Sequence, residues 1–354
     1  MLNRIIRILG TAAYCALLLA GCSIQLDDPV LNREPDTGEA IGFSAGSSLL
    51  LDDAKPTKAA YYDDTSFGVF AFKQSGGTWA HLASKKWKPN FMFNQEVHCL
   101  SSVYTYSPVR YWPNPSQNTI TFWAYSPYDA SPVLLTSGST STAYTSNSQG
   151  LPDMRWTVDG QTDILYSGVV ADQTSASNSG VVEFAFNHAL SRVDIKAEKI
   201  DAGGLYEVTL KEVSFKGIYA TGILKSSDWS WYSYSGYRQD LPVWSGSTVL
   251  NHGTATPTLA SVMPLPQSLT NDACWLHLEF DVSYHENPSN PSSPMLSYST
   301  SRNAYLRDVF YSVGEAWSKN SHYTVTIQIS PDRPIQFTVS WDDWGAEHNY
   351  HLSS

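Results

Sequence analysis

Few residues in this sequence have the types and spacing that catalysis requires. Asp342 and Asp343 lie between two tryptophans, and a carboxylate pair flanked by aromatic rings is a feature of sugar-hydrolysing enzymes. A cell-surface hydrolase would depend on this pair alone. Neighbouring residues of a β-strand point to opposite faces, so the two carboxylates are not expected to act together. His98 and Cys99 are also adjacent, so in a strand they would point to opposite faces, and the histidine could not act as the base for a cysteine nucleophile.

Motifs of the common catalytic and cofactor-binding classes are missing from the sequence. There is no Gly-x-Ser-x-Gly elbow, no His-Glu-x-x-His zinc helix, no calcium loop and no phosphate-binding glycine loop. His188 lies within the apolar stretch 184–190 and is expected to be a turn or packing histidine. The sequence therefore predicts a protein that is not an enzyme and has no metal and no cofactor.

An aromatic segment at residues 229–244 is the candidate binding surface. It contains six aromatic residues separated mainly by Ser and Gly: Trp229, Trp231, Tyr232, Tyr234, Tyr237 and Trp244. Such rings can stack on sugars or contact a protein partner. The alternative is an aromatic hairpin that packs on its own sheet.

The N-terminus has the pattern of an export signal. Arg4 and Arg7 precede an apolar stretch at 8–19, and Leu19-Ala20-Gly21-Cys22 follows. Small residues before a Cys match the lipobox of bacterial lipoproteins, and the apolar stretch is too short to span a membrane. We therefore expect residues 1–21 to be a signal peptide and Cys22 to carry a lipid, such as palmitate, that anchors the protein in the outer membrane at the cell surface.

Charge and cysteine content exclude some functions. The chain has 22 basic and 33 acidic residues, a net charge of −11, which argues against a polyanionic partner such as nucleic acid. Cys99 and Cys274 lie far apart in the sequence. One disulfide between them is arithmetically allowed, but two inert buried thiols are the expected outcome.

From residue 41 onward the sequence alternates with a period of two. Apolar residues occupy every second position in 276–284, 323–329, 335–341 and 193–195. Each such strand should bury one face, as in antiparallel sheets packed face to face. The phase of the alternation changes near Lys211 and Glu212, which predicts a bulge or a tight turn.

These patterns predict an all-β, mainly antiparallel chain with two β-sandwich domains. A flexible tether at 22–40 precedes an N-terminal domain at 41–175 and a C-terminal domain at 176–354, since 172–180 is rich in Ser and Asn. Residues 131–150 and 286–301 are expected to be long loops, and 303–313 one short helical turn.

Several fragments together resemble the fimbrillin (Mfa-like) family of Gram-negative surface lipoproteins, the subunits of type V pili. Each fragment is weak alone, and their order after a lipobox carries the resemblance. The fragments are residues 41–43, 55–59, 67–72, 91–94, 106–113, 120–127, 184–193, 263–267, 317–323 and 337–344.

The resemblance implies two tandem β-sandwich-like (transthyretin-like) domains and an assembly mechanism. In such stalk subunits a protease cuts after a basic residue, the first strand is lost, and a strand of the next subunit fills the groove. Here the cut would follow Lys58, and the lost strand would contain Ile41 and Phe43. The partners would be other pilus subunits that donate a strand.

The role within a pilus stays open. The ten residues after Trp344 include few apolar side chains, which makes a poor donor strand and favours a tip, anchor or accessory subunit over a stalk subunit. A surface glycan-binding lipoprotein is the alternative function, with the aromatic segment 229–244 as its binding surface. A surface protein of a host or another bacterium is a further candidate partner.

Overall fold

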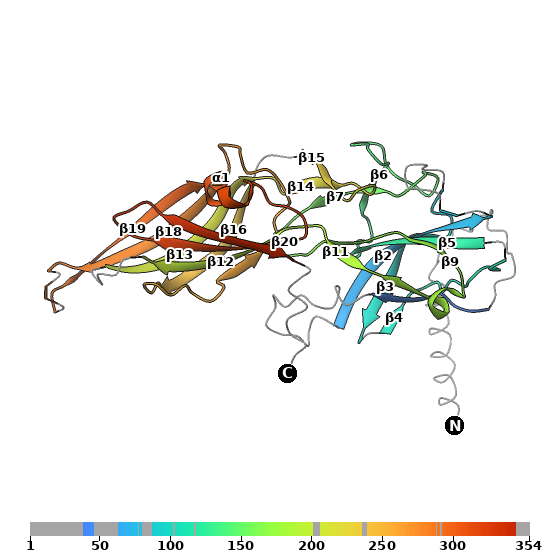
Figure 1. The fold of residues 1–354 in the computed structure, drawn as a ribbon, viewed down its shortest axis with the longest axis horizontal. Coiled ribbons are helices and arrows are strands. Elements are labelled where there is room, and N and C mark those ends of the chain that lie inside the picture. Colours follow the sequence, from blue (N-terminus) through green and yellow to red (C-terminus); the bar gives the residue numbers. More distant parts are fainter. Residues whose placement is uncertain are drawn as a thin grey trace, which may run out of the picture. The chain divides into compact units, whose positions relative to one another are not determined.

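The computed structural model describes residues 38–45, 63–76, 78–79, 87–101, 103–116, 118–200, 206–235, 239–287, 289–290 and 292–344. Their regular secondary structure is almost entirely β-strand (Figure 1), which confirms the all-β prediction. The first eleven strands are β1 (Gly42–Ala45), β2 (Asp63–Ser75), β3 (Met92–Leu100), β4 (Val103–Thr105), β5 (Asn118–Ser126), β6 (Val133–Leu135), β7 (Asp153–Thr157), β8 (Leu165–Ser167), β9 (Val170–Gln173), β10 (Val181–Phe184) and β11 (Phe186–His188).

The later elements have generally longer strands. They are β12 (Arg192–Lys199), β13 (Tyr206–Ile218), β14 (Thr221–Leu224), β15 (Trp231–Ser235), β16 (Gln239–Val249), β17 (Ala260–Val262), β18 (Trp275–His285), β19 (Met295–Tyr305), β20 (Ser321–Ile329) and β21 (Gln336–Asp343). The short helices are η3 (Ser177–Gly180), α1 (Leu306–Val309) and η4 (Tyr311–Val313). No helix of the described part is long and apolar enough to be a membrane span.

A central sheet in the N-terminal half is buried on both faces. Its strand order is β11-β8-β5-β2-β3-β4, with β9 also paired to β5. In β2, Phe67 and Val69 belong to one apolar cluster while Phe70 and Phe72 belong to another. The pair β1-β10 contributes to the first cluster, and the sheet β15-β14-β7-β6 contributes to the second. Strands β2 and β5 are therefore buried on both sides.

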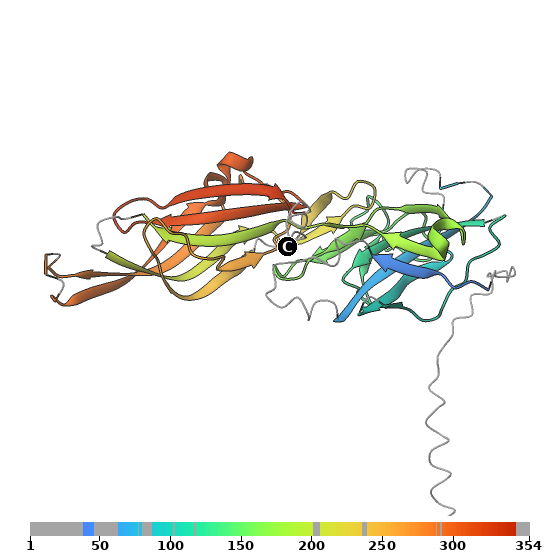
Figure 2. The same cartoon turned by 60° about the horizontal axis from the view of Figure 1, so that its bottom comes forward.

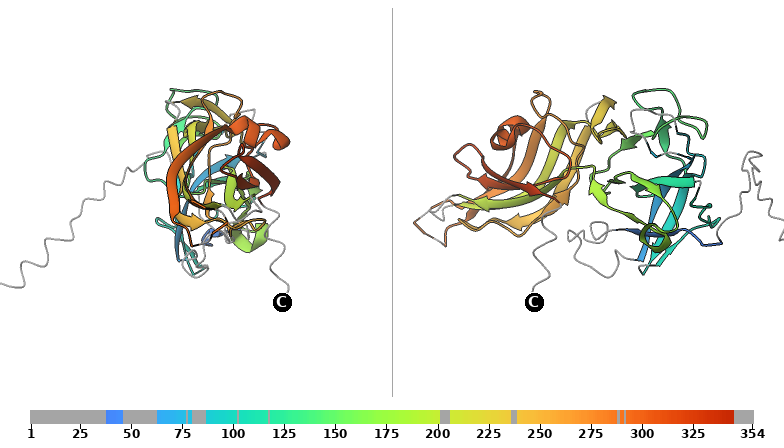
Figure 3. Two further views of the ribbon diagram at one scale, coloured as in Figure 1. Left: turned by 90° about the vertical axis from the view of Figure 1, so that its left-hand side faces the viewer. Right: turned by 45° about the vertical axis from the view of Figure 1, so that its right-hand side comes forward.

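The C-terminal half is a sandwich of two four-stranded sheets (Figure 3). The orders are β16-β13-β18-β19 and β17-β12-β20-β21, and one core contains side chains from both sheets. The alternating residues predicted for β18 and β20 do point into this core. The pairs β1/β10 and β12/β20 are parallel, whereas the other pairs of described strands are antiparallel, as predicted for a mainly antiparallel fold.

Most local predictions hold. The β13 pairing shifts register between Leu210 and Glu212, which confirms the bulge, and α1 with η4 confirms the helical turn. Cys99 and Cys274 are free and buried. The loop predicted at 286–301 is wrong for its second half, because β19 pairs along its whole length with β18.

The predicted boundary between residues 175 and 176 stays a prediction. Several strands that follow it hydrogen-bond to strands that precede it: β10 pairs with β1, β11 with β8, and β14 with β7. Strands within residues 181–235 therefore pair with strands from before the predicted boundary, although they follow it in the sequence. A strand pairs with the sheet edge where its apolar side chains can be buried.

Candidate functional site: the seat of the first strand

The first strand lies beside a strand from the middle of the chain. β1 runs parallel to β10 in a two-stranded sheet, with Phe43 opposite Val182 (Figure 2, blue and yellow-green). The two segments are far apart in sequence, so this pairing is non-local. Within the described residues β10 has no ladder partner other than β1. Loss of β1 would leave the β10 main chain unpaired along this edge.

A second main-chain partner holds the start of the strand. Ala40 forms a bridge with Tyr111. The N–H of Ile41 donates to the carbonyl of Arg110 at 2.9 Å, and the N–H of Trp112 donates to the carbonyl of Glu39 at 2.9 Å. Residues 39–41 therefore bond to residues 110–112, and Gly42–Ala45 pair with β10.

Two side chains anchor the strand in the core. Ile41 is 2% exposed and Phe43 is 6% exposed. The Phe43 ring stacks on Phe184 at a centroid distance of 5.9 Å, with edge contacts to Phe67 and Phe122. Burial of two such side chains stabilises the seated strand by roughly 3–6 kcal/mol before the cost of ordering it.

Tyr106 fixes the backbone at this seat. Its ring meets Phe43 edge-on at 5.1 Å. Its hydroxyl donates to the carbonyl of Ile41 at 2.9 Å and accepts from the N–H of Arg110 at 3.2 Å. Burial raises the pKa of the Tyr106 phenol above its ordinary value, outweighing the hydrogen bond to Arg110. The phenol is therefore a neutral donor at physiological pH, and it links the strand to the 106–112 segment.

Trp112 closes the other end of the seat, next to a glycine that the turn requires. The indole Nε1 donates to the carbonyl of Gly180 at 3.1 Å. Gly180 has φ of +78°, and a Cβ there would lie 2.5 Å from a Glu39 carboxylate oxygen. The left-handed conformation favours glycine, whereas the Glu39 carboxylate is the end of a flexible side chain and can move away. The result is a seat in which aromatic rings surround Phe43 and the main chain of 39–45 pairs with residues 110–112 and with β10.

Ile41 and Phe43 lie where the sequence predicted a first strand, packed into the core. That they leave the fold in exchange for another strand stays a prediction. The lipidation residue Cys22, the cleavage residue Lys58 and the aromatic residue Tyr237 lie outside the described residues. Tyr106 and Trp112 were not predicted as part of the site, although both lie in a fragment that carried the family resemblance.

The aromatic segment 229–244 makes several internal contacts. Trp229 stacks on Trp123, with a centroid distance of 5.7 Å and an interplanar angle of 7°. The Trp231 indole donates to the Ala189 carbonyl at 2.7 Å.

The polar tips of the two neighbouring tyrosines are also used inside the protein. The Tyr232 hydroxyl donates to Asp153 Oδ2 at 2.9 Å, and that of Tyr234 donates to the Pro266 carbonyl at 2.7 Å. Trp244 packs against the C-terminal core. A binding surface on this segment stays a prediction: the Tyr234 ring is exposed, but the polar groups of Trp231, Tyr232 and Tyr234 are used inside the protein.

The residue pairs weighed as catalytic do not form a catalytic arrangement. Asp342 and Asp343 are exposed at the end of β21. Cys99 is buried and His98 points to the other face of β3. Among the described residues, no group of three or more His, Cys, Asp or Glu is placed to hold a metal ion.

His188 is a packing histidine, as expected. Its ring stacks on Trp344 at 3.8 Å, and its Nδ1 lies 2.6 Å from Asp163 Oδ2. Both the histidine and the tryptophan are buried. The ring therefore joins the end of β21 to the end of β11.

These features describe a β-protein built around an inserted first strand, and comparison with known proteins identifies its family. Residues 57–344 match the family described as Fimbrillin-like, and the chain belongs to this family. It is 29% identical over 187 residues to the Fimbrium subunit Fim1C of Phocaeicola vulgatus. That match covers 50% of this chain and 47% of the relative, so the chain spans about half the length of the curated relative it matches.

Two solved structures share the fold. A fimbrial protein from Bacteroides vulgatus superimposes with a TM-score of 0.61 and 18% identity, over 86% of this chain and 99% of that one. A protein described as a candidate cell adhesion protein from Bacteroides uniformis gives a TM-score of 0.51 and 14% identity, over 86% and 98%. At sequence identities of 18% and 14%, the similarity shows a shared fold and nothing more.

Proposed function

We propose that this protein is a structural or adhesive subunit of a cell-surface pilus, without enzymatic activity. Membership of the Fimbrillin-like family is the observation that carries the proposal. The resemblance to a fimbrium subunit and the fold shared with a fimbrial protein support it. The protein is exported, carries a lipid on Cys22, and acts at the outer surface of the cell.

The proposed assembly step is exchange of the first strand. The seat of β1 supports this step, because two buried side chains, Ile41 and Phe43, anchor the segment in the core while its main chain pairs with β10 and residues 110–112. A donated strand would restore the same hydrogen bonds and refill the same aromatic walls, which is β-augmentation between subunits. Cleavage after Lys58 would release β1 from the rest of the chain.

A trypsin-like protease tests the proposal on the purified precursor. The product expected of a strand-exchanging stalk subunit begins at Ala59, found by N-terminal sequencing, and forms concentration-dependent ladders on an unboiled denaturing gel. Lys58→Gln should abolish both. Lys55→Gln is the matched control, since Lys55 precedes a proline and is a poor trypsin site, and it should behave as the native chain does.

Two other results would change the role. Cleavage after Lys58 without any ladder would contradict the stalk version and leave a tip, anchor or accessory subunit. An intact acylated Cys22 as the N-terminus on cells, with β1 still in place, would point to the anchor role. No cleavage of the native chain and no association with any pilus fraction would contradict the proposal as a whole.

A further inference from the structure

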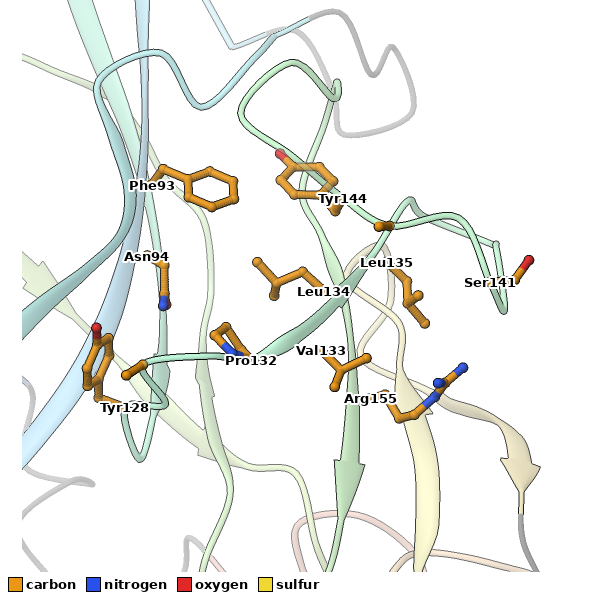
Figure 4. Close-up of a pocket in the computed structure, with 12 residues that line it drawn as sticks. Phe93, Asn94, Tyr128, Pro132, Val133, Leu134, Leu135, Ser141, Tyr144 and Arg155 are labelled. Atoms are coloured by element: carbon orange, nitrogen blue, oxygen red, sulfur yellow. The ribbon is translucent and has the colours of Figure 1, made fainter. Parts of the chain in front are cut away.

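An open groove of about 610 Å³ lies beside the central sheet, away from the first strand (Figure 4). It is lined by β3, the 128–135 segment, residues 141–144 and β7. Figure 4 shows Phe93 and Tyr144 at one end of the groove and Arg155 at the other, with Leu134 and Leu135 between them. The proposed pilus role uses none of these side chains.

The apolar end presents a fixed aromatic ring. Phe93 is 40% exposed although it sits in a strand. One face of its ring stacks on Tyr144 at 6.2 Å with an interplanar angle of 6°, and Phe70 meets it edge-on at 5.4 Å. These contacts hold the ring in one orientation, so a ligand can bind its exposed part with little loss of side-chain entropy.

The polar end presents a cation that lacks an ionic partner. Arg155 Nη2 donates to the Thr140 carbonyl at 2.6 Å. Its Nε is buried and bonds to no acceptor among the described residues. Among the described residues, no ion pair joins Arg155 to a carboxylate.

The closest acidic residue along β7 is already occupied. Asp153 accepts hydrogen bonds from Gly138, Ser226 and Tyr232. The half-buried Arg155 guanidinium keeps N–H groups that no carboxylate of the described residues occupies, and an anion brought by a ligand can pair with them. The groove therefore suits a ligand that brings a carboxylate to Arg155.

The backbone around the groove is already paired, which argues against an added strand. The edge of β6 is covered: Leu135 is bridged to Ala143. The N–H of Tyr144 donates to the Leu134 carbonyl at 3.0 Å, and the N–H of Thr136 donates to the Thr142 carbonyl at 2.8 Å. A peptide that binds by β-augmentation needs free main-chain groups, so recognition here must come from side chains.

We propose that this groove binds an acidic saccharide, a pyranose chain that carries a ring carboxylate. The planar guanidinium of Arg155 would pair with the carboxylate. A sugar face would stack on the exposed part of the Phe93 ring. Tyr128 and Ser141, which also line the groove, offer hydroxyl groups to the sugar. This ligand class would give the protein an adhesive target independent of how the subunit assembles.

Calorimetric titration of the full chain tests the proposal. The probes are 3′-sialyllactose and a hyaluronan hexasaccharide, which carry carboxylates, with lactose and a carboxyl-reduced hyaluronan hexasaccharide as neutral counterparts. A blocked hexapeptide of alternating Asp and Glu tests an acidic peptide as ligand. We expect saturable binding of at least one carboxylate sugar, about tenfold or more tighter than its neutral counterpart.

Variants locate the site. Arg155→Gln and Phe93→Leu should each weaken binding of the carboxylate sugar about tenfold or more. Arg302→Gln is the control for charge, because Arg302 is exposed on β19, and it should change nothing. Phe93→Tyr keeps the ring, so it should retain binding even if Phe93→Leu alters folding; thermal melting reports the fold of each variant.

Several outcomes would overturn the proposal. These are equal binding of the neutral sugars, equal or tighter binding of the acidic peptide, an equal loss in Arg302→Gln, or no binding of either carboxylate probe. Because Lys58 cleavage and ladder formation are measured separately, failure here leaves the pilus role untouched, and failure of the pilus role leaves this result untouched.

Discussion

Strand β1 and strand β18 are held in the same molecule by very different means. β1 has four residues, and the buried side chains that anchor it are Phe43 and Ile41, which directly precedes the strand. β18 has eleven residues, pairs with β13 and β19, and buries four alternating apolar side chains in the C-terminal core. By area, two buried side chains are worth roughly 3–6 kcal/mol and four roughly 6–12 kcal/mol.

This difference shows where the fold can exchange a strand. Removal of β18 would leave the main chains of β13 and β19 unpaired along one edge and would divide the sheet. Removal of β1 would leave main-chain groups of β10 and of residues 110–112 unpaired, but would break no strand pairing of the seven-stranded sheet. A replacement strand would need only two well-placed apolar side chains to match β1. The short strand is therefore the exchangeable one, and the long strands form the permanent scaffold.

The largest expected effect concerns the anchor of the short strand. Phe43→Ala removes a ring that contacts four other rings, and should lower the free energy of unfolding by about 3–5 kcal/mol. Urea denaturation followed by tryptophan fluorescence measures it. Tyr311→Ala, at a position that is 74% exposed, is the control and should stay within about 0.5 kcal/mol of the native chain. An equal, small effect of both substitutions would contradict the burial argument.

A smaller effect is expected at a buried charge of the scaffold. Burial would raise the pKa of Asp194, but the imidazole of His322, whose Nε2 lies 3.1 Å from Oδ2, and the charge of Arg192 outweigh it and hold that pKa at about 2. The folded pKa is depressed, so the stabilisation is present above the unfolded value of about 4 and is lost as pH falls from about 4 to about 2. Asp194→Asn should cost about 2 kcal/mol at pH 7.

The pH dependence supplies the check on this second effect. The difference in unfolding free energy between Asp194→Asn and the native chain should shrink as denaturation is repeated from pH 7 down to pH 2.5. Glu207→Gln removes a charge from an exposed position of β13 and serves as the control. A difference that stays constant with pH would mean that the carboxylate charge is not what stabilises β12.

The smallest effect is expected at the hydroxyl that ties β1 to the 106–112 segment. Tyr106→Phe keeps the ring against Phe43 but removes the bond to the Ile41 carbonyl, and should cost about 1 kcal/mol. Hydrogen exchange at the β1 amides measures it locally. Tyr298→Phe on β19, where the side chain is exposed, should leave the exchange of β1 unchanged. No change in Tyr106→Phe would show that ring packing alone holds the strand.

The alternation of residue types was enough to predict much of the scaffold. Leu276, Leu278 and Phe280 share one parity and all point into the core, because successive side chains of a strand point to opposite faces. The change of parity near Lys211 likewise predicted the bulge that the β13 pairing contains. Ile41 and Phe43 were placed in a first strand by the resemblance to the fimbrillin family.

Other features depended on which segments meet in three dimensions. Phe67 and Phe70 point to opposite faces of β2 and are both buried, because separate layers cover the two sides of the sheet. The tryptophans at 229 and 231 suggested a surface but pack internally. Residues 295–301 suggested a loop, because exposed serines alternate with the apolar residues of an edge strand.

The sequence by itself determined which side chains share a face, where the phase of a strand changes, and the family to which the chain belongs. Only the tertiary structure decided that β1 pairs with β10, that Tyr106 and Trp112 complete its seat, and that Phe93 and Arg155 line one groove. The reason is physical: a period of two is a local property of an extended backbone. The layer that covers a face, and the strand that pairs with an edge, are set by contacts between distant segments.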